Sequence, residues 1–195
     1  MPMSHVQVAD PKERSSIFQV ISLGFCADPI ARWLWPDAET YLAVMPRFAL
    51  AFGGGGFDEG SVYRTDCGHA VAMWLPPGVE SDADSMGAIL EESVAAERME
   101  EIGSFLAQMN HFHPDEPCWY LPVIAADPSR TGRGLGAALM KHALQKCDAQ
   151  GLPAYLESSN PRNISLYERY GFEIMGKIET QSSPLMTPMY RPASR

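Results

Sequence analysis

The chain has 195 residues, of which 46% are hydrophobic and 20% are charged, and its formal net charge is −9 at pH 7. This length and apolar content predict one globular domain over residues 1–195 with a sizeable core. The acidic balance repels nucleic acid and anionic lipid, and no stretch approaches the roughly 20 apolar residues that a membrane span needs, so we expect no nucleic-acid partner and no membrane partner. The 4 cysteines are scattered without zinc-site or disulfide spacing, which favours a cytoplasmic location and no bound metal.

The first half of the chain is predicted to be mainly helical. The segment "FQVISLGFCADPIARWLWPD" has apolar residues at helical spacing, broken at Pro29 and Pro36, which predicts two short helices. A further helix is expected in "AETYLAVMPRFALAFGGGG", ended by the glycines 53–56, which we interpret as a flexible loop. "SVYRTD" and "HAVAMWLPPG" predict a hairpin around Cys67 and Gly68, and residues 84–114 are predicted to be helical.

The second half alternates between strands and helices. "CWYLPVIAADP" predicts a largely apolar strand, and "GLGAALMKHALQKCDAQG" predicts a helix closed by Gly151. "PAYLESS" predicts the next strand, and Asn160 and Pro161 are expected to begin a short helix as its cap and first residue. "FEIMGKIE" and "LMTPMYR" predict closing strands. The order indicates a single α/β (α+β) domain with a mixed sheet flanked by helices.

The run "DPSRTGRGLGAALM" places three glycines, Gly132, Gly134 and Gly136, at the start of the predicted helix. A helix start leaves backbone N–H groups free for a phosphate, although a glycine-rich turn can also bind nothing. Gly134 lacks the following Lys and Ser/Thr of a P-loop. Gly132, Gly134 and Ala137 fit a loose dinucleotide pattern, with Glu157 on the next strand, but too little chain follows for that fold.

Three segments, in the expected order, resemble the GNAT acetyltransferase superfamily. "VIAADPSRTGRGLGAALM" is similar to its strand, pyrophosphate loop and helix, "PAYLESSNPRN" to its next strand and helix start, and "LYERYGF" to its L-Y-x-x-x-G-F ending. The likeness is strongest over residues 118–175. Together with "DPIARWLWPD" and "WLPPG", the same segments resemble the puromycin N-acetyltransferase-like branch. Thr131 departs from the pattern, because the family has Gln or Arg there.

The resemblance implies a mostly antiparallel sheet with a splayed central parallel strand pair, and acetyl-CoA as the cofactor. The pantetheine arm would lie beside Ile124, Ala125 and Ala126, with a family bulge in that strand that suits Pro122; an edge-strand proline is the alternative. Asn160 and Asn163 match polar positions beside the arm. The loop residues that would hold the pyrophosphate are Arg130, Thr131, Gly132, Arg133, Gly134, Leu135, Gly136 and Ala137.

The resemblance also implies direct attack of a primary amine of a small molecule on the thioester. Tyr167 matches the family's proton donor to the leaving thiolate and also contacts the cofactor site, while Glu157 is our candidate base. Trp33, Trp74 and Tyr120 are candidate acceptor-binding residues, although Trp is as often simply core. A non-catalytic acyl-CoA-binding protein is the alternative function, and a monomer or homodimer is expected.

Overall fold

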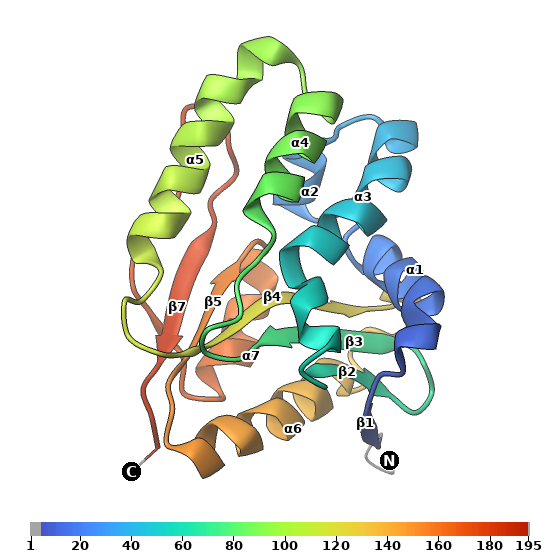
Figure 1. Cartoon of the computed structure of the whole chain (residues 1–195), viewed down its shortest axis with the longest axis vertical. Coiled ribbons are helices and arrows are strands. Elements are labelled where there is room, and N and C mark those ends of the chain that lie inside the picture. Colours follow the sequence, from blue (N-terminus) through green and yellow to red (C-terminus); the bar gives the residue numbers. More distant parts are fainter. Residues whose placement is uncertain (1–4, 195) are drawn as a thin grey trace.

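The computed structural model describes residues 5–194, and over that range it contains a seven-stranded sheet in the order β1-β2-β3-β4-β5-β7-β6 (Figure 1). Neighbouring strands are antiparallel except for β4 and β5, which form the single parallel pair in the described range. The predicted fold class is therefore confirmed. The strands are β1 Val6–Val8, β2 Val62–Thr65, β3 Ala70–Leu75, β4 Trp119–Ala126, β5 Ala154–Ser158, β6 Glu173–Ile174 and β7 Thr187–Arg191.

Helices cover both faces of the sheet. Side chains of α1 to α5 pack in one apolar cluster against β2, β3 and β4, and α6 and α7 pack in a second cluster on the opposite face. In Figure 1, α6 lies below the sheet and α1 to α5 lie above it. None of the helices in residues 5–194 combines the length and apolarity needed to cross a membrane. The helices are α1 Arg14–Gly24, α2 Pro29–Leu34, α3 Ala38–Gly53, α4 Ala83–Ser93, α5 Met99–Phe112, α6 Leu135–Gln150 and α7 Ile164–Glu168.

Short polar residues begin several of these helices, because they accept hydrogen bonds from otherwise free backbone N–H groups. Asp28, Asp37 and Asp82 cap α2, α3 and α4 in this way. The predicted cap Asn160 accepts from Arg162 N at 3.1 Å and begins the 3-10 turn that leads into α7. Gly151 ends α6 at φ 62°, as its position after the helix predicts.

The central strand β4 carries a bulge at its proline. Its pairing with β3 shifts between Met73 and Leu75, which pair with Val123 and Tyr120 respectively. Leu121 packs in the α6 cluster, whereas Val123 packs in the α1–α5 cluster on the other face. In a regular strand, two residues at positions i and i+2 face the same side of the sheet. The expected bulge at Pro122 is therefore confirmed.

The structure differs from the sequence prediction in four segments. Residues 84–114 do not form one helix, because α4 ends before Val94 and a 3-10 turn at Ala96–Arg98 precedes α5. The sequence does not predict a strand at Val6–Val8, where the structure has β1. Only two residues of the predicted strand "FEIMGKIE" form β6. The glycine run is not a flexible loop: Gly54–Phe57 is a 3-10 turn in which two of the glycines are buried.

Close backbone approach explains the buried turn. A Cβ on Gly56 would lie 2.6 Å from the backbone oxygen of Trp74, which cannot move aside without disturbing β3. Gly56→Ala should therefore destabilise the fold by about 1–3 kcal/mol, the range seen for overpacked interiors. In the interior of α5, Gly103 has open space around its position, so Gly103→Ala should stabilise by about 0.5–1 kcal/mol.

Thermal unfolding of the two variants beside the parent protein checks this pair of predictions. A melting temperature for Gly56→Ala that equals or exceeds that of the parent would contradict the packing described for the 3-10 turn.

Candidate functional site

The parallel strands β4 and β5 separate soon after they meet. Their pairing is limited to Trp119 with Ala154 and Tyr120 with Tyr155. Beyond Tyr120, β4 continues to Ala126 and is paired on its other edge with β3. Within the described part of the chain, the backbone of residues 121–126 therefore has one edge without a strand neighbour, and a gap opens between the two central strands.

The glycine loop lies beyond the end of β4 and leads into α6. The first backbone hydrogen bond of that helix runs from Ala138 N to Gly134 O at 3.0 Å, and no carbonyl in the described range accepts from the N–H groups of residues 132–137. Gly132 and Gly134 have φ of 76° and 78°, a region that favours glycine, and nothing lies within 4 Å of where a Cβ would be. The free N–H groups are those of Gly132, Arg133, Gly134, Leu135, Gly136 and Ala137.

The side chains of the loop contribute less than its backbone. Thr131 donates its hydroxyl to Pro128 O at 2.8 Å and so holds the turn itself. Arg130 has a buried Nε without a hydrogen-bond partner among the described residues, and Arg133 is exposed. Free N–H groups at a helix start form an anion site, which one cationic side chain beside them would strengthen.

A cavity of about 530 Å³ runs from this loop to the helices above the sheet. Its polar end is lined by Thr131 and Asn163, its middle by the free edge of β4, and its far end by apolar side chains of α2 to α5 such as Trp35 and Phe48. Ile124, Ala125, Ala126, Asn160, Tyr167 and Glu157 also line it. The structure thus brings the predicted strand, asparagine and catalytic residues around one space, whereas Thr131 is the one predicted loop residue among those that line it.

Glu157 lies on β5 beside this cavity and is largely removed from water. Burial raises its pKa to about 7, and the hydrogen bond that Tyr120 donates to its Oε2 at 2.8 Å opposes that shift. A carboxyl group with such a pKa exchanges protons easily near neutral pH, which suits a general base. Tyr120, predicted to bind acceptor, thus lies against the candidate base.

Tyr167, on α7, is buried at 4% exposure and contributes to the wall of the same cavity. Burial, and then the negative charge of Asp28, raise the pKa of its phenol, so the hydroxyl keeps its proton at neutral pH. Tyr170 instead donates to Ala137 O at 2.7 Å and ties α7 to α6. The two tyrosines of "LYERYGF" therefore differ in position, because Tyr167 lines the cavity and Tyr170 does not.

Two further residues line the cavity with Tyr167 and were not predicted from the sequence. Asp28 lines the cavity and is buried at 6% exposure, and Ser159 donates to its Oδ2 at 2.6 Å. Burial raises the pKa of Asp28 despite this hydrogen bond. The Asp28–Pro29 pair signals a helix cap in the sequence, but no pattern connects residues 131 positions apart.

The two tryptophans predicted to bind acceptor lie away from the cavity. Trp74 is fully buried between the sheet and α6, on the face opposite to the cavity. Trp33 donates its Nε1 to Ser182 Oγ at 3.0 Å and packs on Phe105, while its neighbour Trp35 lines the cavity instead. Helical periodicity does not predict which of Trp33 and Trp35 faces the cavity, because α2 is short and begins at a proline.

Comparison with known proteins adds an independent line of evidence. The family model "Acetyltransferase (GNAT) family" matches residues 64–172, which is more than half of the chain. An uncharacterized N-acetyltransferase of Schizosaccharomyces pombe is 27% identical over 133 residues, 59% of this chain and 53% of that protein. Mycothiol acetyltransferase of Thermomonospora curvata is 33% identical over 133 residues, 58% of this chain and 44% of that protein. The chain spans about half the length of these curated relatives.

Solved structures share the whole fold. A histone acetyltransferase and related acetyltransferase from Corynebacterium glutamicum superposes with a TM-score of 0.69 at 24% identity, covering 99% of this chain and 98% of that one. Polyamine N-acetyltransferase of Drosophila melanogaster gives 0.66 at 14% identity, covering 97% and 100%. These likenesses concern the fold, whereas the family model matches the strands, the loop and the tyrosine helix described above. The chain therefore belongs to the GNAT family of acetyltransferases.

Proposed function

We propose that this protein transfers the acetyl group of acetyl-CoA to the primary amine of a small molecule. One observation carries the proposal: a single cavity is lined by Thr131 at the start of the glycine loop, by a carboxyl group with a pKa of about 7 and by a protonated phenol. We also propose that residues 1–195 act as one acetyltransferase domain. The resemblance to the puromycin N-acetyltransferase-like branch stays a prediction.

GNAT acetyltransferases take the acetyl group from acetyl-CoA, and the residues present fit that donor. Its pyrophosphate would accept from the N–H groups between Gly132 and Ala137, which have no partner among residues 5–194. Its pantetheine amides would pair with the unpaired edge of β4 at Ile124 to Ala126. Asn160 and Asn163 line the same cavity and would offer side-chain amides to the arm.

The transfer needs two proton movements besides the formation of the N–C bond and the breaking of the C–S bond. The attacking amine must lose a proton, and Glu157 would accept it, because its carboxylate form is populated at neutral pH despite burial. The leaving thiolate must gain a proton, and Tyr167 would donate it, because its phenol is protonated there. Tyr167 is only 4% exposed, so its proton transfer would take place away from bulk water.

The glycine loop can be tested by binding alone. Gly134→Ala forces a φ of 78° on a residue with a Cβ, at a cost of about 1–2 kcal/mol, so the loop should shift and acetyl-CoA affinity should fall about tenfold. Gly151→Ala is the matched control, since Gly151 has φ 62° at the other end of α6. Titration calorimetry with acetyl-CoA should separate the two variants. Equal affinity in both would remove the loop from the cofactor site.

Replacement of Tyr167 by Phe removes the proposed proton donor without changing the shape of the cavity wall. We expect kcat for release of the CoA thiol to fall by about 10²–10⁴-fold, while the Kd for acetyl-CoA stays nearly constant. Tyr170→Phe serves as the control, because Tyr170 bonds a backbone carbonyl outside the cavity. Unchanged turnover in Tyr167→Phe would exclude the residue from the mechanism.

The pH dependence follows from the raised pKa of Glu157. Its carboxylate is the active form, so kcat/KM should rise with pH and reach a plateau above about pH 7. Glu157→Gln should lower kcat/KM at the plateau and abolish its rise, the acidic limb of the pH profile. Tyr120→Phe removes a hydrogen bond that lowers the pKa of Glu157, so the limb should move to higher pH. A limb that survives in Glu157→Gln would assign the base to another group.

A further inference from the structure

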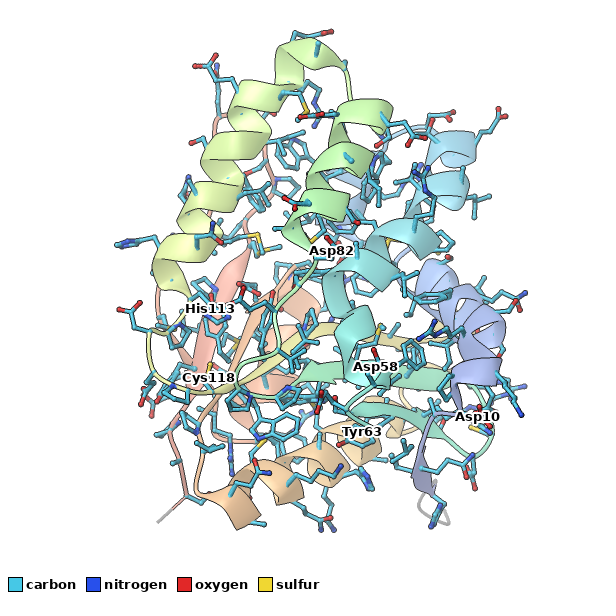
Figure 2. The ribbon with its side chains drawn as sticks, viewed as in Figure 1. Asp10, Asp58, Tyr63, Asp82, His113 and Cys118 are labelled. Atoms are coloured by element: carbon cyan, nitrogen blue, oxygen red, sulfur yellow. The ribbon has the colours of Figure 1, made fainter. Side chains whose placement is uncertain are left out.

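A second cavity, of about 830 Å³, adjoins the first on the side where α5 meets the sheet. It extends from the loop after β3 to the segment between α5 and β4, where His113 and Cys118 lie (Figure 2). The acetyl-CoA proposed above accounts for the first cavity and its phosphate loop but uses none of this space. The residues that line both cavities, and so form a shared wall, are Phe52, Met86, Leu90, Leu106, Met109 and Glu157.

Glu157 is the single polar side chain of this shared wall. The other five members are apolar, and two of them are methionines, whose flexible side chains adapt readily to a neighbouring group. Tyr120 lines the second cavity and fixes the Glu157 carboxylate through its 2.8 Å hydrogen bond. A group that occupies the second cavity can therefore reach the candidate base from the side opposite to the phosphate loop.

The charged side chains that line the second cavity are acidic. Among the described residues that line it, four are carboxylic acids and none is Lys or Arg, although His113 is present. Glu116 accepts from Tyr190 OH at 2.6 Å, while Glu80 and Asp115 are exposed near the loops. The four acids are Glu80, Asp115, Glu116 and Glu157. A cation is favoured at such a surface, whereas a carboxylate or phosphate on the ligand is repelled.

The rest of the lining is suited to an apolar or aromatic body. Phe52 and Tyr120 pack edge to face with ring centroids 5.9 Å apart, and both border the cavity beside Glu157. Leu75, Val79 and the shared wall supply aliphatic surface. Aromatic faces attract ammonium groups as well as apolar ligands, so the same wall suits both parts of an arylalkylamine.

From these observations we infer that the acceptor occupies the second cavity and is a primary amine that carries an apolar body and no anionic group. The inference rests on the proposed acetyl transfer and narrows its acceptor class. The ammonium group approaches Glu157 and gives it one proton, and the neutral amine nitrogen then forms the N–C bond as the C–S bond breaks. Tyr167 donates its proton to the leaving thiolate and regains one from the acylated nitrogen, so the one proton released in the reaction stays on Glu157 until solvent removes it. Amino acids, amino-sugar phosphates and nucleotides are outside this class because each bears an anion.

The most direct test compares amines that differ in one feature. Thiol release from acetyl-CoA at pH 8 should give phenethylamine a kcat/KM about 100-fold above that of phenylalanine, which adds only a carboxylate; this ratio corresponds to about 2.7 kcal/mol. Phenethylamine should also exceed ethylamine, which lacks the apolar body, by at least tenfold. Spermidine provides a comparison with a charged body and should be poorer than phenethylamine.

The outcomes separate the two proposals. If phenylalanine or spermidine matches or exceeds phenethylamine, the acceptor class is wrong while the acetyl transfer stands. If the protein binds acetyl-CoA but none of the four amines releases thiol, the proposed function fails, and the inferred acceptor class fails with it.

A charge variant ties this selectivity to the second cavity. The double substitution Glu80→Gln with Asp115→Asn removes two carboxylates from its lining and should raise the relative kcat/KM for phenylalanine several-fold. The control, Asp84→Asn with Glu97→Gln, removes the same charge from exposed residues that line neither cavity, and should leave the ratio unchanged. Equal ratios in the two double variants would contradict the placement of the acceptor.

A steric variant tests the same placement independently of charge. Leu106 lines both cavities from α5, so Leu106→Trp should reduce kcat/KM for phenethylamine at least tenfold and change that for ethylamine much less. Ala107 is exposed on the same helix, which makes Ala107→Trp the matched control. A loss that is equal for both amines in Leu106→Trp would point to general disruption instead of a filled acceptor space.

Discussion

The site depends on the early separation of β4 from β5. Parallel pairing stops after Tyr120, and beyond the bulge at Pro122 the side chains of Val123 and Ala125 pack with the helices above the sheet. Proline has no N–H to donate, so a central strand tolerates it only where a ladder is interrupted. That interruption leaves the backbone edge of residues 121–126 free, and every candidate site residue in the cavity is arranged around it.

The two layers of helices contribute different residues to the site around the gap between β4 and β5. Below the sheet, α6 follows β4 through the glycine loop, of which Thr131 lines the cavity, and α7 brings Tyr167 to the same space. Above the sheet, α2 to α5 close the cavity with apolar side chains and remove Glu157 from water. A buried carboxyl group is costly for stability, and its pKa near 7 is the consequence that makes it useful in a proton transfer.

Local signals in the sequence predicted much of this arrangement. The glycines at 132 and 134, the cap at Asn160 and the end of α6 at Gly151 follow from backbone requirements that single residues report. Contacts between distant segments could not be predicted. No sequence pattern predicts the Ser159–Asp28 hydrogen bond or the one between Tyr120 and Glu157. Nor does the sequence predict that Trp74 packs in the α6 cluster whereas Trp35 packs in the α1–α5 cluster. The buried turn at Gly56 was mistaken for a flexible loop because its constraint is the carbonyl of Trp74, on another strand.

The central claim is that the free edge of β4 and the glycine loop together hold acetyl-CoA. The most direct measurement is a titration of the ¹⁵N-labelled protein with acetyl-CoA, followed by amide chemical shifts. The account predicts that the amides of residues 121–126 (apart from Pro122) and 132–137 shift most, while those of β1 and β2 stay in place. Large shifts confined to other segments, with both of these stretches unchanged, would contradict it.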